Sequence, residues 1–142
     1  MSDAAAPLRV EHSDLDYDSD LIFTYQGQLF TGVAYEDVPG KWLSEVSYRD
    51  GMQEGPARDW YPSGVLKGES HYRENALHGT SREFDESGRL VSEKTYEYGI
   101  LVSRKELDTS GHVTDSFEIT PDHQHYARLE RYRQVKRWPT SA

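Results

Sequence analysis

Apolar and polar residues alternate along the middle of the chain, and the pattern recurs every 24 residues. Three tyrosines and three glutamates keep this interval: Tyr48, Tyr72 and Tyr96, and Glu45, Glu69 and Glu93. A larger apolar position, filled by Trp42, Leu66 and Leu90, keeps it as well. Because side chains alternate along a strand, Leu66 and Tyr72 are expected on one face and Glu69 on the other.

Turn residues divide each 24-residue unit in two. Glycine recurs at Gly40, Gly64 and Gly88, and a second turn position holds Gly51, Asn75 and Gly99. Asn75 indicates a left-handed backbone there, since asparagine is the usual substitute for glycine in that conformation. Two turns per unit leave two strands of about six residues, so each unit is predicted to be a β-hairpin.

The repeat therefore predicts an all-β protein, an elongated antiparallel sheet of seven or eight strands over residues 21–119, in about four units. Helical spacing does not fit, because glycines interrupt every candidate helix. The last unit departs from the pattern at Ser103, where Gly55 and Gly79 stand in earlier units, which leaves its strand pairing open. A stack of such units presents an elongated surface more readily than a catalytic pocket.

Residues 1–20 form an acidic segment outside the repeat. We expect the first eight or so to be disordered, and Val10, Leu15 and Tyr17 to anchor the rest against the first unit. The alternation Asp14, Asp16, Asp18, Asp20 invites comparison with an EF-hand. Counted from Asp14, however, the required glycine and glutamate positions hold Ser19 and Tyr25, which favours a solvated acidic face.

Residues 120–142 change character and predict a basic amphipathic helix followed by a short tail. Thr120, Pro121 and Asp122 resemble a helix start, and Pro139 a stop, so the helix is expected over residues 121–138. Apolar residues recur every three positions: Tyr126, Leu129, Tyr132, Val135 and Trp138. We expect this helix to cover an end or one face of the sheet; binding to RNA or lipid is the alternative.

Composition narrows the class of protein. Hydrophobic residues make up 35% of the 142 residues and the mean hydropathy is −0.85, which predicts a thin core supplied partly by tyrosine rings. The chain has no cysteine, which excludes disulfides and thiolate metal sites. It shows neither a signal peptide nor an apolar run of membrane-spanning length, so a cytoplasmic protein is expected.

The net charge of −9 is unevenly distributed. Residues 120–142 carry a balance of +3, so the remainder sums to −12. An acidic body repels nucleic acid and membranes and favours encounter with a basic partner. The plainer interpretation is that acidic surfaces aid solubility.

Evidence for catalysis is scarce. The chain has neither a G-x-S-x-G elbow nor a phosphate-binding glycine loop. His123 and His125 are too few for a closed zinc site. Glu45, Glu69 and Glu93 are expected to line up on one face, paired in part with Lys67, Arg89 or Lys94, rather than to form a glycosidase pair. We therefore expect a protein that is not an enzyme and holds no cofactor or metal.

Aromatic and acidic residues at matching places in successive units are the best candidates for partner binding. They are Tyr35, Glu36, Asp37, Asp59, Tyr61, Glu83 and Asp85. Trp60 and Phe84 could belong to this surface or to the thin core. By alternation, Asp59, Glu83 and Asp85 point away from these two rings.

The segments 48–66 and 72–93 resemble the bacterial variant of the MORN repeat, and the segment 25–36 resembles the first repeat of proteins grouped as YwqK-type antitoxins. The likeness extends over roughly residues 21–119. It implies an elongated sheet of hairpins without catalytic residues. It also implies an antitoxin or immunity role, in which the protein binds a cognate toxin and blocks it. Gly68 departs from the pattern, since a polar residue is usual there.

The leading hypothesis is an immunity protein or antitoxin that binds a basic toxin, such as a nuclease or another enzyme acting on nucleic acid, and occludes its active site. The main alternative is a MORN-repeat scaffold or interaction module without a toxin partner. A hydrolase dependent on Glu69 or Glu93, and membrane association through Trp138, are further alternatives. Direct binding of nucleic acid is not expected.

Overall fold

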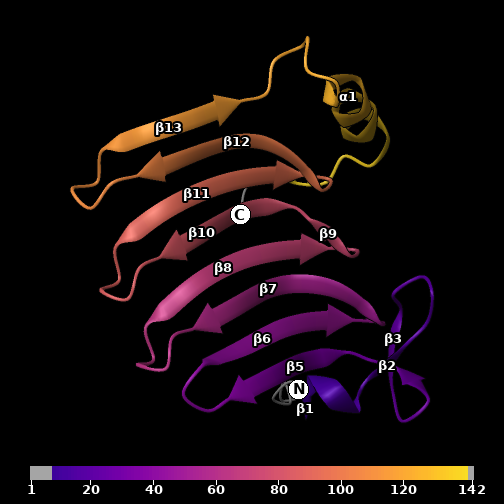
Figure 1. Ribbon diagram of the computed structural model, residues 1–142. Helices are drawn as coiled ribbons and strands as arrows, with labels where there is room; N and C mark the ends of the chain where they lie inside the picture. Colours follow the sequence, from indigo (N-terminus) through magenta and orange to yellow (C-terminus); the bar gives the residue numbers. More distant parts are fainter. Residues whose placement is uncertain (1–7, 141–142) are drawn as a thin grey trace, which may run out of the picture.

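A computed structural model describes residues 8–140 as one curved sheet with a cap at each of its two edges (Figure 1). The expectation of disorder at the N-terminus falls mainly on residues 1–7, outside the described residues. The main sheet contains β1 (Arg9–Glu11), β5 (Gly32–Val38), β6 (Trp42–Arg49), β7 (Met52–Trp60), β8 (Leu66–Arg73), β9 (Ala76–Leu77), β10 (Gly79–Phe84), β11 (Leu90–Glu97), β12 (Ile100–Leu107) and β13 (Val113–Glu118).

Eight of these strands form an antiparallel meander in the order β5-β6-β7-β8-β10-β11-β12-β13. This confirms the predicted sheet of hairpins. The short β9 pairs only with β8, and β1 adds a parallel strand beside β5. Ser103 is paired on both sides, with Thr95 and Glu118, so the fourth unit keeps its place in the sheet.

At one end of the strands, which we call the closed end, the chain reverses through pairs of left-handed residues. The second member of each pair is Gly51, Asn75 or Gly99, with φ of 86°, 70° and 79°, and the residue before it is left-handed too. Two consecutive positive φ angles define the tight type I′ turn, whose twist matches that of the strands. The left-handed conformation predicted for Asn75 is therefore confirmed.

The closed-end turns are hydrogen-bonded to one another. Gly51 N–H donates to Phe30 O at 2.8 Å, Asn75 N–H to Gln53 O at 3.0 Å, and Gly99 N–H to Leu77 O at 2.7 Å; each donor lies one unit after its acceptor. Asn75 does more than a glycine could, because its Oδ1 also accepts the Gln53 N–H at 2.7 Å. The 24-residue period is thus built into the backbone bonding of this end.

At the opposite end, the open end, the turns are longer and their glycines stand clear of other segments. The backbone N–H groups of Tyr61, Asp85 and Asp108 each donate to a carbonyl four residues later, at 2.9 Å. A left-handed glycine completes each turn, at Gly64, Gly88 and Gly111. A Cβ placed on any of these glycines would meet nothing within 4 Å.

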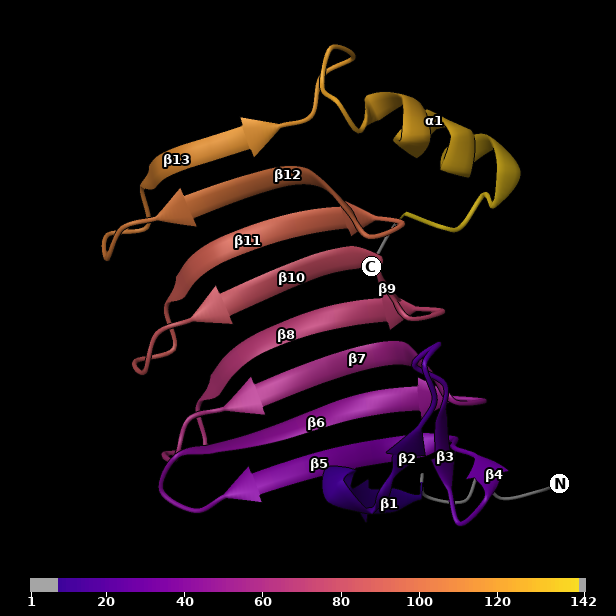
Figure 2. The ribbon, with the colours of Figure 1, turned by 45° about the vertical axis from the view of Figure 1, so that its right-hand side comes forward.

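The N-terminal cap is a separate small sheet rather than the first hairpin of the main one. It consists of β2 (Asp16–Tyr17), β3 (Phe23–Tyr25) and β4 (Gln28–Leu29), preceded by the 3-10 turn η1 (His12–Asp14). Figure 2 shows it in front of the closed ends of β5 to β7. The repeat-like segment around Tyr25 therefore folds outside the main sheet, whose first long strand begins at Gly32.

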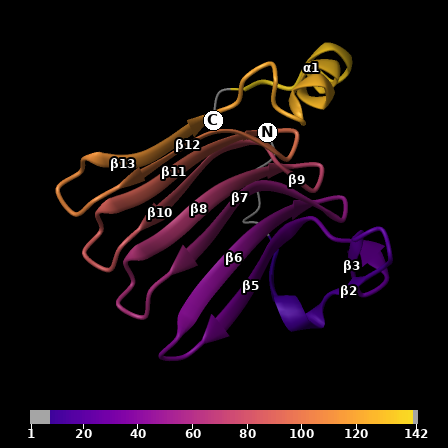
Figure 3. The same cartoon turned by 45° about the horizontal axis from the view of Figure 1, so that its top comes forward.

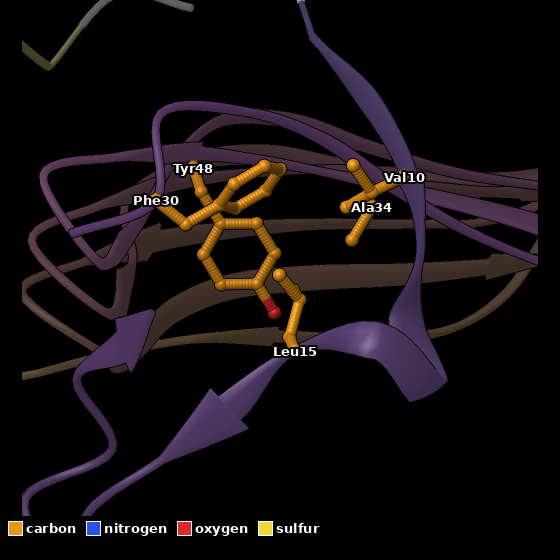
Figure 4. Close-up of a cluster of buried hydrophobic side chains, with 5 residues drawn as sticks. All are labelled: Val10, Leu15, Phe30, Ala34 and Tyr48. Carbon is orange, nitrogen blue, oxygen red and sulfur yellow. The ribbon is translucent and has the colours of Figure 1, made fainter. Parts of the chain in front are cut away.

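This cap buries the larger hydrophobic cluster of the molecule. Val10 and Leu15 pack with three residues of the first unit, Phe30, Ala34 and Tyr48 (Figure 4). The predicted anchors Val10 and Leu15 are thus buried. Tyr17 is not: it is 64% exposed, although its ring lies 5.3 Å from that of Phe23, its partner in the cap sheet.

The C-terminal cap is the helix α1 (Tyr126–Val135), which lies beyond the closed end of β11 and β12 (Figure 3). Leu129 is fully buried against Tyr98, Ile100 and Val102. The helix is shorter than the predicted 121–138. Residues 120–126 form successive turns, closed by the N–H groups of His123 and Tyr126, and the Thr120 hydroxyl bonds the Asp122 carboxylate instead of capping a helix.

Spacing by threes also misplaces Val135, which is 74% exposed. Three residues turn a helix by about 300°, so each step moves the side chain about 60° further around the axis. Leu129 and Tyr132 remain on the buried side and Val135 has rotated off it. Trp138 reaches the core again only because the helix has ended, and its ring stacks on Tyr98 at 5.0 Å.

Candidate functional site

The strand register places two rows of side chains across the sheet, one on each face. Directly paired residues point to the same face, so a chain of pairings traces a row. On what we call the ladder face, the row runs through β5 to β12 as Tyr35, Glu45, Arg58, Glu69, Arg82, Glu93 and Lys105. The three periodic glutamates therefore line up as predicted.

Each of these glutamates is neutralised by a cation in the same row or beside it. Glu69 meets Arg58 at 2.6 Å, and Glu93 meets Arg82 at 2.8 Å and Lys105 at 3.5 Å. The Arg82 hydrogen bond is the main reason that the pKa of Glu93 lies below its usual value.

The prediction of which cations pair with the glutamates is wrong. Glu45 meets Arg9 at 3.0 Å, from the parallel strand β1. None of Lys67, Arg89 and Lys94 forms an ion pair with Glu45, Glu69 or Glu93 in the described part of the chain. The register between strands decides which charges face one another. It places Arg58 directly beside Glu69, and Arg82 directly beside Glu93.

The opposite face, which we call the groove face, carries a second row with a different charge. It runs through β5 to β13 as Glu36, Ser44, Asp59, Gly68, Glu83, Ser92, Glu106 and Asp115. Five of these eight positions are acidic and none is basic. Arg104, from the neighbouring row, reaches Asp115 at 3.1 Å at one edge.

Asp59 and Glu83 are the exposed centre of this row. Within residues 8–140, neither carboxylate has an ion pair or a side-chain hydrogen bond. Between them lies Gly68, which leaves a groove of about 250 Å³ where other units would carry a side chain. The other residues that line the groove include two cations, Arg82 and Lys94, and the paired Glu69; the remainder are Val46, Ala57, Ser70, Tyr72, Ser81 and Ser92.

The electrostatics of the groove match this arrangement. Burial, followed by the nearby Asp59 carboxylate, raises the pKa of Tyr72 above its usual 10.0. A phenol is protonated at neutral pH even at its usual pKa, so Tyr72 can donate a hydrogen bond in the groove. The groove can hold a cationic or hydrogen-bonding group between two carboxylates, a task suited to binding.

The structure separates the seven residues singled out in the sequence. Glu36, Asp59 and Glu83 share the groove face. Tyr35 lies on the ladder face, where the Arg9 guanidinium covers its ring at 4.0 Å. Asp85 belongs to an open-end turn: its carboxylate accepts the N–H groups of Ser87 and Arg89 at 2.9 and 3.0 Å, and the pKa of Asp85 is lowered by the Ser87 hydroxyl and these bonds.

Asp37 and Tyr61 lie together at the open end, in a pocket of about 420 Å³ formed by the first two hairpins of the main sheet. Trp42, Leu43, Trp60 and Pro62 supply its apolar walls. Trp60 is therefore a half-buried wall of a pocket. Trp42 fills a periodic apolar position in the sequence, yet it is 41% exposed; its place next to a turn was the available signal.

The histidines do not assemble a metal site. The His123 and His125 rings lie 5.3 Å apart, but His123 Nδ1 accepts the backbone N–H of His125 at 3.1 Å. Among residues 8–140, no three His, Asp or Glu side chains come together as metal ligands. In the same part of the chain, no helix is long and apolar enough to cross a membrane.

Sequence comparison identifies the middle units. Residues 53–74 and 77–98 match the family described as MORN repeat variant. They cover β7 to β8 and β9 to β11, the part of the sheet that holds Asp59, Gly68 and Glu83. The match supports a MORN-repeat protein and a repeat-based interaction module, and it does not extend to an antitoxin family. A comparison with curated proteins finds no match.

Solved structures with some likeness are much larger chains. One is described as accessory secretory protein 1,2 and 3 of Streptococcus pneumoniae: identity is 12%, covering 84% of this chain and 21% of that one, with a TM-score of 0.37. Another is a GtfA/B complex bound to UDP and GlcNAc, with 16% identity, 63% and 19% coverage and a TM-score of 0.36. This chain spans about a fifth of their length, and likenesses this weak carry no argument about function.

Proposed function

We propose that this protein is an immunity protein or antitoxin whose groove face binds a basic surface of a cognate toxin and occludes the toxin's active site. The observation that carries the proposal is the exposed, unneutralised pair Asp59 and Glu83. The same sheet neutralises its other row of carboxylates with arginines, so the difference between the faces is specific rather than a result of overall acidity.

Physical arguments support a protein partner of opposite charge. An open row of carboxylates speeds the encounter with a basic surface and selects against acidic ones. A nuclease or another enzyme that acts on nucleic acid has such a surface, because it must attract phosphates. The resemblance of the first unit to YwqK-type antitoxins and the match to MORN repeats in the middle units agree with a binding role without catalysis.

The experiment begins with co-expression of the chain with the products of neighbouring genes, followed by co-purification and a toxicity assay. With the partner identified, the double variant Asp59→Asn/Glu83→Gln is compared with Glu74→Gln/Glu118→Gln, which removes the same charge from exposed positions away from the groove. We expect the groove variant to weaken binding by about tenfold or more and the control variant by less than about twofold.

Three results would count against the proposal. They are a footprint confined to the ladder face, an affinity that does not change with salt, and equal effects of the two double variants. A partner that binds through the groove face without being toxic would favour the scaffold interpretation, which the repeat match also supports.

A further inference from the structure

The open-end pocket has the chemistry of a binding site in its own right. Its walls come from the ends of β5 to β7 and the turns that follow them, and they include the paired residues Leu43 and Trp60. Trp42 and Tyr61 line the pocket too. At about 420 Å³ it is large enough for one long side chain, and its Trp42 wall is hydrogen-bonded to Glu36, the first residue of the groove-face row.

Hydrogen bonds hold two of the aromatic walls in place. The Trp42 indole Nε1 donates to Glu36 Oε1 at 3.1 Å, and the Tyr61 hydroxyl donates to Phe84 O of the next unit at 2.8 Å. A pocket whose walls are already fixed loses little conformational entropy when it is filled, which favours binding. These bonds also leave the apolar ring faces, rather than the polar tips, to line the space.

Cations already lie over several aromatic rings of the molecule. In the described residues, Arg9 covers Tyr35, and Arg73 and Lys136 both flank Trp138, at 4.0 to 5.2 Å. Within the pocket itself, Lys67 approaches the Tyr61 ring at 5.8 Å. Trp42 and Trp60 have no such cation within residues 8–140. Tryptophan is the best aromatic partner for a cation, so the two strongest rings are the two without one.

Carboxylates complete the match. Glu36 and Asp37 are both exposed beside the pocket, and Asp37 lines it. Neither has an ion pair among the described residues. Apolar walls, exposed ring faces and a nearby carboxylate suit an arginine side chain. Its stem is apolar, and its planar guanidinium stacks on rings and is less strongly hydrated than a lysine ammonium.

We propose that the pocket of Trp42, Trp60, Tyr61 and Asp37 binds an arginine side chain of the partner protein, as an anchor point at the open end of the sheet. The inference deepens the proposed function, since it takes the partner to be a basic protein. It can be tested without that partner, so the two can fail separately.

The test titrates N-acetyl-arginine amide into the full-length, ¹⁵N-labelled protein and follows the three indole N–H signals by NMR. We expect the signals of Trp42 and Trp60 to shift along one saturating curve with a dissociation constant of about 1 mM, typical of one side chain. Trp138 is the internal control. N-acetyl-citrulline amide has the same shape without the charge and is expected to bind at least about fivefold more weakly.

Variants locate the site. Trp60→Leu is expected to weaken arginine binding by about tenfold, and Asp37→Asn by about threefold. Glu86→Gln removes the same charge from an exposed open-end turn outside the pocket and is expected to change nothing. Asp37 is exposed, so its variant keeps the fold even if Trp60→Leu does not.

Shifts that do not saturate, equal binding of citrulline, or equal effects of Asp37→Asn and Glu86→Gln would overturn the inference. If arginine binds as expected but no toxin is found among the neighbouring gene products, the pocket stands and the toxin hypothesis fails. If a toxin is found whose binding ignores the pocket variants, only this inference fails.

Discussion

The two ends of the sheet reverse the same chain by different means. At the closed end, tight turns of two left-handed residues lie under the N-terminal and C-terminal caps and bond to one another through backbone groups. At the open end, longer turns close on their own hydrogen bonds and have free space around their glycines. Stability is therefore concentrated at one end, which leaves the other end and its pocket available for binding.

The sharpest way to break this comparison is a pair of glycine substitutions. Gly51 and Gly88 have nearly the same φ, 86° and 88°, but a Cβ on Gly51 would lie 2.7 Å from Ile22 Cγ2 and 2.8 Å from Phe23 O, whereas nothing lies within 4 Å at Gly88. A left-handed alanine costs about 1 kcal/mol at either position. The clash at Gly51 adds about 1–3 kcal/mol.

Urea unfolding of Gly51→Ala and Gly88→Ala measures the difference. We expect Gly51→Ala to lose about 2–4 kcal/mol of unfolding free energy, and Gly88→Ala only the smaller backbone part. Equal losses would show that the closed-end turns are no more tightly packed than the open-end turns.

A second test compares tryptophans. Trp138 stacks on Tyr98, meets the His78 ring edge-on at 5.0 Å and donates its backbone N–H to the Tyr98 hydroxyl at 3.0 Å. Because Trp138 remains partly exposed, we expect Trp138→Ala to cost about 2 kcal/mol, below the range for a fully buried ring. Trp42→Ala at the open end should cost less than about 1 kcal/mol.

Thermal and urea unfolding of both variants decide the matter. Far-UV circular dichroism serves as the control for retained strand content. If Trp42→Ala lost more unfolding free energy than Trp138→Ala, the stabilising packing would lie at the open end. That result would weaken the assignment of Trp42 to a binding pocket.

The smallest expected effect concerns the open-end turn at Asp85. Hydrogen bonds lower the pKa of Asp85 below its usual 3.8, so its ionised form favours the folded state. That contribution is present above pH 3.8 and is lost as the pH falls through the lowered value. Asp85→Asn should therefore lower the urea midpoint slightly at neutral pH and not in strong acid.

Asp59→Asn is the matched control, because the Asp59 carboxylate has no protein partner in the described residues. Its substitution should leave the urea midpoint unchanged or raise it. A difference between wild type and Asp85→Asn that persists unchanged in strong acid would show that the carboxylate charge does not stabilise the turn.

Much of the architecture could be predicted from periodicity. The hairpin unit, the eight-stranded meander and the left-handed Asn75 follow from local signals, namely alternation and turn residues. The face on which each side chain lies was harder to predict. Counting along β8 places Leu66 on the same face as Tyr72. A register shift between Asp59 and Trp60 instead pairs Leu66 with Trp60, on the face opposite the groove. Bulges arise between strands, so one strand's sequence does not reveal them.

The site shows the same limit. Asp59 and Glu83 could be chosen as acids at equivalent places in successive units. That Gly68 lies between them, or that Arg58 and Arg82 occupy the opposite face, depends on pairings between residues 9 to 15 positions apart in the sequence. The first unit shows a stronger version: Tyr25 keeps the sequence pattern but folds into a separate small sheet, because the β1 segment takes the edge beside β5.

The continuous pairing across the sheet has a consequence for how such a protein can change over generations. Each unit carries two strands, so equivalent side chains of neighbouring units stand about 10 Å apart, close to the distance over which salt screens a charge. Duplicating one 24-residue unit would therefore add one acid to the groove face and one neutral pair to the ladder face without moving the others. The length of the charged surface is then set by copy number, and its ends can diverge while its middle stays constant.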